Sequence, residues 1–142
     1  MLSRVRVTGF SLLRSAEVEF GPGLTVVTGE SGAGKSLLLD AVAFALGARP
    51  NRSLLARGSE SCEVELVLEL DQARAARLEV PWNAGENIVL RKYHSSGRSS
   101  ARINGEVVTQ QLLRGSGDAL VEIAGQFESR VLFKPESHLQ LS

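Results

Sequence analysis

The sequence predicts an α/β fold in which a mixed β-sheet surrounds one buried helix. Residues 5–10 and 16–20 alternate apolar and polar side chains, which predicts two strands of a sheet with one face in water. Residues 24–29 (LTVVTG) form a continuous apolar run, typical of a strand that is buried on both faces. Residues 36–46 (SLLLDAVAFAL) are apolar nearly all round, so the helix they predict lies buried between layers.

The rest of the chain is rich in strands. Residues 62–70 alternate with Glu63, Glu65 and Glu69 on the solvent face, and Gly47 ends the preceding helix as a C-cap. Later elements are predicted in this order: a short helix before Pro81, a hairpin of strands 87–94 and 99–105, a tight turn at Asn104–Gly105, a short helix capped at Thr109, and a strand at 119–125.

Composition indicates one folded domain that spans residues 1–142. Apolar residues make up 43% of the chain, and 16 basic residues balance 16 acidic ones, so no overall basic field indicates nucleic acid. The single cysteine, Cys62, excludes an internal disulfide. The sequence has neither the pattern of a secretory signal nor an apolar run long enough to span a membrane, so we expect a cytoplasmic protein.

Residues 29–36 (GESGAGKS) match the phosphate-binding pattern G-x-x-x-x-G-K-[S/T] in full. Gly29 and Gly34 let the backbone curl so that successive N–H groups face phosphate oxygens, and the following helix adds its positive N-terminal dipole. Lys35 is expected to reach the β- and γ-phosphates, and the Ser36 hydroxyl to bind Mg²⁺. An apolar strand before the motif and a helix after it provide the context that such a loop requires.

Residues for hydrolysis are harder to find than those for binding. A nucleotide hydrolase usually has a second acidic residue at the end of an apolar strand, and no apolar run in this chain is followed by two acids. The nearest candidates, Asp71 and Glu122, follow alternating strands, so solvent-exposed carboxylates are the favoured interpretation. Two alternatives to an incomplete nucleotide hydrolase therefore stay open: a self-contained P-loop phosphotransferase that uses Asp71 or Glu122, and a nucleotide-sensing module that never hydrolyses.

The order of several motifs resembles that of the RecN proteins, bacterial double-strand-break repair ATPases related to the structural-maintenance-of-chromosomes (SMC) group. These motifs are GESGAGKS, AFALGAR (43–49), GRSSARINGEVV (97–108), EIAGQ (122–126) and KPESHLQL (134–141). The resemblance implies the N-terminal lobe of an ABC-type ATPase head, with a coiled coil beginning near the C-terminus. It also implies ATP and Mg²⁺ as ligands, a C-terminal lobe that supplies the missing acids, a head-to-head homodimer, DNA as a partner, and a location at the bacterial nucleoid without a membrane.

The same resemblance implies roles for two residues outside the loop. Gln126 matches the Q-loop glutamine that touches Mg²⁺ and the attacking water, and with Lys35 it is a candidate catalytic residue. Arg57 resembles an arginine that reaches nucleotide phosphate, and Arg49 and Arg52 compete with it for this role. The candidate nucleotide-binding residues are then Gly29, Glu30, Ser31, Gly32, Ala33, Gly34, Lys35, Ser36, Leu37 and Arg57.

Basic residues also gather around the hairpin at 87–103. Arg91, Lys92, Arg98 and Arg102 could contact DNA phosphates. A solvated hairpin is the favoured interpretation, because Lys and Arg side chains normally lie at the surface.

Overall fold

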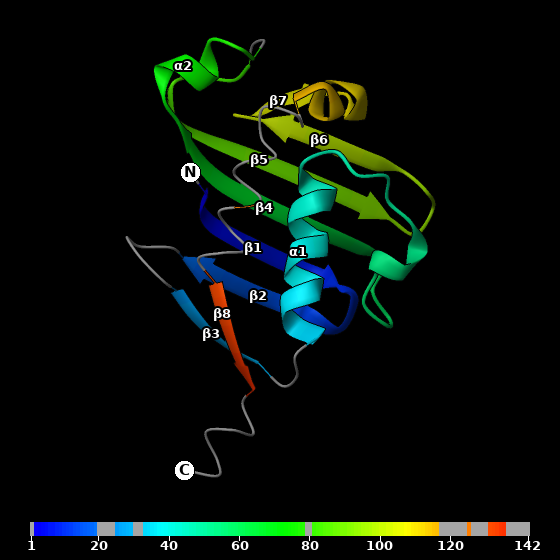
Figure 1. The fold of residues 1–142 in the computed structure, drawn as a ribbon. Coiled ribbons are helices and arrows are strands. Elements are labelled where there is room, and N and C mark those ends of the chain that lie inside the picture. The colour runs from blue at the N-terminus through cyan, green and yellow to red at the C-terminus, as the bar shows by residue number, and fades with distance from the viewer. Residues whose placement is uncertain are drawn as a thin grey trace.

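In the described part of the chain, two β-sheets and the long helix α1 form most of the architecture (Figure 1). The computed structural model describes residues 2–19, 25–29, 33–78, 81–116, 125 and 131–135. Within these ranges, the larger sheet has six antiparallel strands in the order β2 (Arg14–Glu19), β1 (Leu2–Phe10), β4 (Ser61–Leu70), β5 (Gly85–His94), β6 (Ser99–Ile103) and β7 (Glu106–Val108). The mixed arrangement predicted from the sequence is thus divided between this sheet and a small parallel one.

Alternation along the strands decides which face of the large sheet is buried. In β1, Val5 and Val7 are buried while Arg6 between them is exposed, and β4 repeats this pattern around Glu65. Because successive side chains point to opposite faces, one face becomes apolar and the other carries the charges. The predicted solvent position of Glu63, Glu65 and Glu69 is confirmed, since all three are more exposed than the buried residues beside them.

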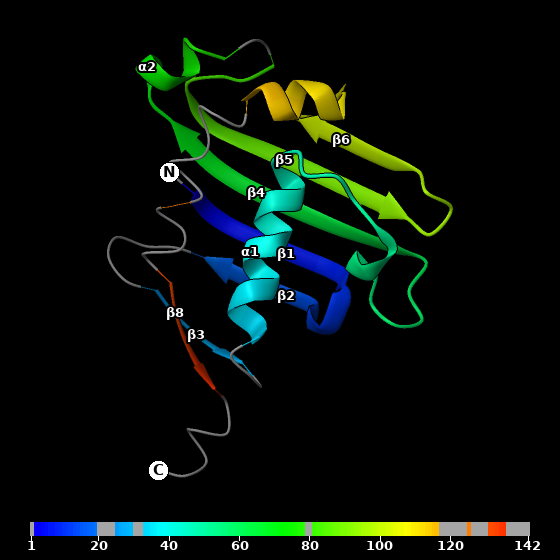
Figure 2. The same cartoon turned by 45° about the vertical axis from the view of Figure 1, so that its right-hand side comes forward.

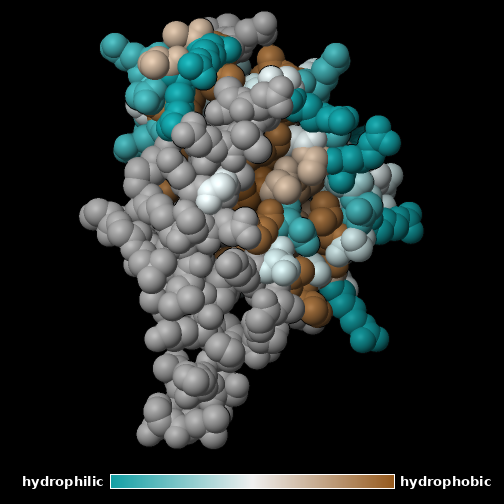
Figure 3. Space-filling view, in the orientation of Figure 1, coloured by the Kyte–Doolittle hydropathy of each residue, from teal (hydrophilic) through white to brown (hydrophobic). Residues whose placement is uncertain are grey.

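The helix α1 (Ala33–Ala45) packs against the apolar face of the large sheet (Figures 1 and 2). Ala41, Val42 and Ala45 are almost fully buried, but Ser36 and Ala43 are exposed. The expectation of a helix buried nearly all round is therefore wrong for the described residues, because the sheet covers only one side of α1. Hydrophobic side chains gather over α1 in the space-filling view (Figure 3).

Gly47 ends α1 as the sequence predicts. Its φ is +116°, and the Ala48 amide donates to Ala43 O at 3.0 Å while the Gly47 amide donates to Phe44 O at 3.1 Å. This pair of bonds is the Schellman arrangement, which needs a residue in a left-handed conformation. A side chain at Gly47 would also put its Cβ 2.9 Å from the Arg114 nitrogen, so glycine is required for packing as well.

The second sheet pairs β3 (Thr25–Gly29) with β8 (Val131–Pro135) in parallel. Figures 1 and 2 show this pair near the β2 edge of the large sheet. The strand β8 was not predicted, whereas the predicted strand at 119–125 falls almost entirely outside the described residues. Among the described residues, this sheet has two strands.

A helical segment at 110–116 covers the apolar face over the far strands, and a short helix α2 (Gln72–Ala75) follows β4. Thr109 caps the segment through its hydroxyl, which accepts from the Leu112 amide at 3.1 Å, so the predicted cap is confirmed. The Trp82 indole N–H donates to the Ser116 hydroxyl at 3.1 Å and fixes the other end of the segment.

Candidate functional site

The phosphate-binding motif lies between a strand and a long helix. The strand β3 ends at Gly29, the first residue of the motif, and α1 begins at Ala33, four residues later. The strand-loop-helix context expected from the sequence is therefore present. The free N–H groups and the dipole at the N-terminus of a helix favour a bound anion, and at 13 residues α1 is long enough to have both.

The first turn of α1 contains the residues expected to handle phosphate and metal. Ala33, Gly34, Lys35 and Ser36 all belong to this turn; Ser36 is exposed and the next residue, Leu37, is half-buried. An exposed serine hydroxyl at this point suits a Mg²⁺ ligand, because Mg²⁺ prefers oxygen donors. Glu30, Ser31, Gly32 and Gln126 lie outside the described residues.

The segment before Arg57 is tied to the end of β1. Phe10 and Leu55 form an antiparallel bridge, and the Ala56 amide donates to Gly9 O at 2.8 Å. Gly9 itself packs against the start of β4, since its φ is +67° and a Cβ there would lie 2.5 Å from the Ser61 carbonyl oxygen. Arg57 is exposed and follows this anchored backbone directly.

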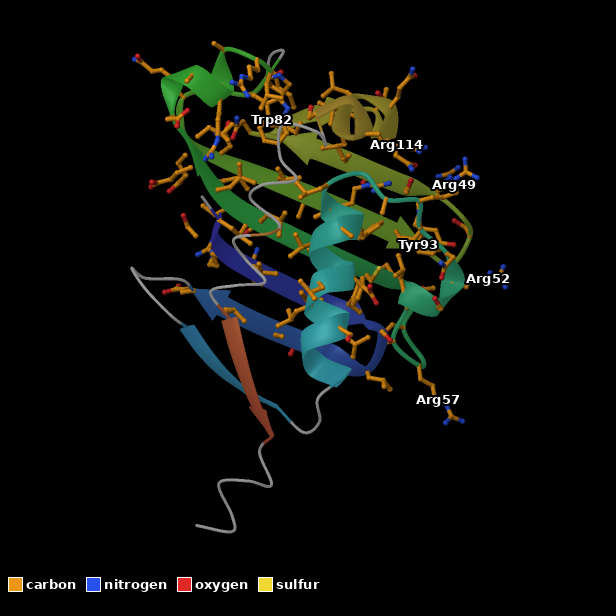
Figure 4. The ribbon with its side chains drawn as sticks, in the orientation of Figure 1. Arg49, Arg52, Arg57, Trp82, Tyr93 and Arg114 are labelled. Carbon is orange, nitrogen blue, oxygen red and sulfur yellow. The ribbon has the colours of Figure 1, made fainter. Side chains whose placement is uncertain are left out.

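The three candidate arginines lie at different levels along α1. The turn η1 (Ser11–Leu13), which follows β1, contacts α1. Figure 4 shows Arg57 level with the N-terminal end of α1, Arg49 at the C-terminal end, and Arg52 between them. Of the three, Arg57 is therefore the arginine on the side of the phosphate-binding loop.

Arg91 corrects the interpretation of the basic hairpin. Its side chain is 1% exposed and faces the core, so it is neither solvated nor available to DNA. Its guanidinium lies 4.5 Å from the centre of the Phe44 ring and donates through Nη1 to Phe44 O at 2.8 Å and to Ala48 O at 3.3 Å. Burial lowers the pKa of Arg91. The alternation of β5 was a usable signal, because Val89, Arg91 and Tyr93 share one face.

The sequence offered Asp71 and Glu122 as acidic candidates for a Mg²⁺ partner. Asp71 accepts from the Arg74 amide at 2.7 Å and caps α2, at the far end of the molecule from the loop (Figure 1). It is therefore a helix cap and not a Mg²⁺ ligand of this site, and Glu122 lies outside the described residues. No group of three or more potential metal ligands occurs where the structure can be searched. None of the described helices is long and apolar enough to cross a membrane.

The strand β3 and the helix α1 flank the motif as in P-loop proteins, and the chain was compared with protein families. A family model described as an AAA domain matches residues 4–136. The chain belongs to this family.

Within that family, the chain is similar to the DNA repair protein RecN. It is 36% identical to RecN of Halalkalibacterium halodurans over 146 residues, 38% to RecN of Xylella fastidiosa over 145 and 36% to RecN of Bacillus subtilis over 147. Each match covers 99% of this chain, which spans about a quarter of the length of these relatives (26%, 26% and 25%). The resemblance predicted from the motifs is confirmed.

Solved structures with the same fold include heads of SMC proteins. The Smc head domain of Pyrococcus furiosus, bound to the C-terminal domain of ScpA, has a TM-score of 0.65 at 25% identity over 83% of this chain and 32% of its own. The SMC head domain of Thermotoga maritima has a TM-score of 0.61 at 25% identity over 80% of this chain and 41% of its own. The predicted fold class, an N-terminal lobe of an ABC-type ATPase head, is thereby confirmed.

Proposed function

We propose that this chain is the ATP-binding half of an SMC-like ATPase head that acts in DNA double-strand break repair and recombination. The observation that carries the proposal is a complete phosphate-binding motif between β3 and α1, in a chain similar to RecN along 99% of its length. ATP is proposed as the nucleotide because the relatives are SMC-like ATPases, and the bacterial nucleoid as the location.

Each proposed site residue has one task. The backbone amides of residues 29–34 and the N-terminus of α1 hold the phosphates, and Lys35 neutralises the charge of the β- and γ-phosphates. Ser36 would hold Mg²⁺, which supplies electrostatic stabilisation when bound. Arg57 would add a guanidinium to the phosphates, supported by its position level with the N-terminal end of α1 (Figure 4). Gln126 would orient the attacking water.

Hydrolysis is proposed to require a C-terminal lobe and a second head. The described part of the chain has no group of three or more potential metal ligands, and α1 keeps exposed residues on the side that the sheet does not cover. A parallel pair such as β3 and β8 gains stability from further strands and from helices on its faces. A lobe that covers α1 and extends this pair would supply both the missing surface and the missing carboxylates.

Nucleotide binding by the isolated chain tests the loop. Lys35→Ala should abolish ATP binding measured by titration calorimetry, because the phosphates lose their main side-chain cation. Lys92→Ala is the matched control, since Lys92 is an exposed lysine on β5. This variant should bind ATP as the parent protein does.

ATP turnover tests whether hydrolysis requires the C-terminal lobe. The chain alone should release no phosphate from ATP, and addition of the C-terminal lobe of a RecN protein should restore release, with Gln126→Ala lowering it. Robust turnover by the chain alone would refute the proposal and favour the phosphotransferase. Binding without turnover in the presence of the lobe would favour the nucleotide-sensing module.

A further inference from the structure

A hollow of about 620 Å³ lies near the C-terminal end of α1, away from the phosphate-binding loop. It is lined by Arg49, Gln110, Gln111, Arg114 and Gly115. Arg49 and Arg114 are both exposed and point outward on the same side of the molecule (Figure 4). Two guanidinium groups thus flank one open depression.

The backbone around this hollow is held in place by specific contacts. The Gln110 side-chain amide donates to Gly47 O at 3.3 Å and joins the helical segment 110–116 to the end of α1. Arg91 holds Ala48, the residue before Arg49, from below. The two arginines therefore project from anchored backbone, and the buried guanidinium adds positive charge beneath them.

Arg4 and Arg6 have an acidic partner, whereas Arg49 and Arg114 have no ion pair among the described residues. On the solvent face of the large sheet, Arg4 and Arg6 form ion pairs with Glu65 at 3.1 and 2.9 Å, and Lys92 lies opposite Glu63 in the strand register. Among the described residues, neither Arg49 nor Arg114 has an ion-pair partner, and the lining of the hollow includes no carboxylate. The two guanidinium groups would attract an anion that entered the hollow, and no carboxylate of the described lining would compete with it.

The lining also indicates which part of a nucleic acid would bind. Arginine binds phosphate with a planar fork of donors, whereas single-stranded bases are usually held by stacking on aromatic side chains. The described lining contains no aromatic residue. The chemistry therefore fits the phosphodiester backbone of a duplex, contacted without reading its sequence.

We propose that the hollow between Arg49 and Arg114 binds backbone phosphates of duplex DNA. This inference rests on the proposed function for its choice of DNA among polyanions. It places the duplex at the C-terminal end of α1 and the nucleotide at the N-terminal end. The hairpin residues Lys92 and Arg102 are not part of the contact.

The salt dependence of duplex binding tests the proposal. Binding of a labelled duplex of mixed sequence by the full chain is measured by fluorescence anisotropy, for the parent and for Arg49→Gln/Arg114→Gln. Each lost phosphate contact lowers the slope of log affinity against log salt by about 0.9, so losing two lowers it by about 1.8. Between about 50 and 200 mM salt, the parent should then lose about 12-fold more affinity than the variant does.

The matched control is Lys92→Gln/Arg102→Gln, which removes the same charge from exposed residues on the solvent face of the sheet. It should keep the parental slope. An unchanged slope in Arg49→Gln/Arg114→Gln, an equal loss in the control, or tighter binding of a single strand than of the duplex would overturn the proposal. ATP binding measured on the same proteins separates the two hypotheses: Arg49→Gln/Arg114→Gln should retain it, and Lys35→Ala should lose it while keeping duplex binding.

Discussion

Replacement of Arg91 tests how a buried cation without a carboxylate partner is tolerated. Its Nη1 donates to two main-chain oxygens, and its Nε and Nη2 atoms are buried with no hydrogen-bond partner among the described residues. Hydrogen bonds from a charged donor contribute about 1.5–3 kcal/mol each, and the 3.3 Å bond to Ala48 O lies at the weak end. The gain is therefore about 4 kcal/mol.

Against this gain stands the cost of leaving two donor nitrogens of Arg91, Nε and Nη2, which carry three N–H groups, without a partner among the described residues. Each buried unsatisfied donor costs about 1–3 kcal/mol, which for the two gives about 3 kcal/mol. Methionine preserves much of the length of the side chain and removes both the hydrogen bonds and the unpaired donors. Arg91→Met should therefore lower the free energy of unfolding by only about 1 kcal/mol. Arg91→Ala also opens a cavity under Phe44, which adds about 2 kcal/mol and gives a loss of about 3 kcal/mol.

Urea denaturation followed by the fluorescence of Trp82, the single tryptophan of the chain, measures both variants. Because Trp82 is 4% exposed and bonded to Ser116, its emission reports on the packed state. Equal losses in Arg91→Met and Arg91→Ala would refute the reasoning, since they would mean that the hydrogen bonds dominate and the unpaired N–H groups cost nothing.

Two further predictions concern the same end of α1. Gly47→Ala should lower the melting temperature, and it should lower the free energy of unfolding by about 1–3 kcal/mol. The reason is that alanine at φ +116° is strained and its Cβ would meet the backbone nitrogen of Arg114. The control is Ala43→Gly, at an exposed helical position, which should lower the free energy of unfolding by about 1 kcal/mol. Burial raises the pKa of the Cys62 thiol, so its contribution to stability is complete below the unfolded pKa of about 8.5 and is lost as pH rises toward the folded pKa. Between pH 8 and 10, calorimetry should find a steeper fall in stability for the parent than for Cys62→Ala, and parallel curves would contradict this.

Local patterns predicted most of the large sheet and could not predict the small one. The strands β1, β4 and β5 alternate with period two over long stretches, so their existence and their buried faces follow from the sequence. The strand β8 pairs with β3 across about a hundred residues, and nothing in the run Val131–Pro135 specifies that partner. Parallel pairing is a long-range property, which a local pattern does not contain.

The candidate site also has parts that local patterns predict and parts that they do not. The phosphate-binding motif is contiguous, so spacing alone identified it. The choice among Arg49, Arg52 and Arg57 depends on how the loop after α1 returns to β1, and the bridge between Phe10 and Leu55 determines that path. Arg91 was misassigned because residue type suggested the surface, although the alternation of β5 placed it inside.

The length of α1 keeps the two proposed ligands from touching. Thirteen residues at 1.5 Å each give a helix of about 20 Å, with Lys35 in its first turn and Gly47 just beyond its end. A change in ATP affinity caused by duplex DNA would therefore have to pass through α1 and the groups that fix it, of which Arg91 holds the last turn to β5. Arg91→Met removes that link together with the buried charge beneath the hollow, but it replaces no residue of either proposed contact surface. It should leave each ligand bound by itself and weaken any coupling between them, whereas direct contact between the ligands would leave the coupling unchanged.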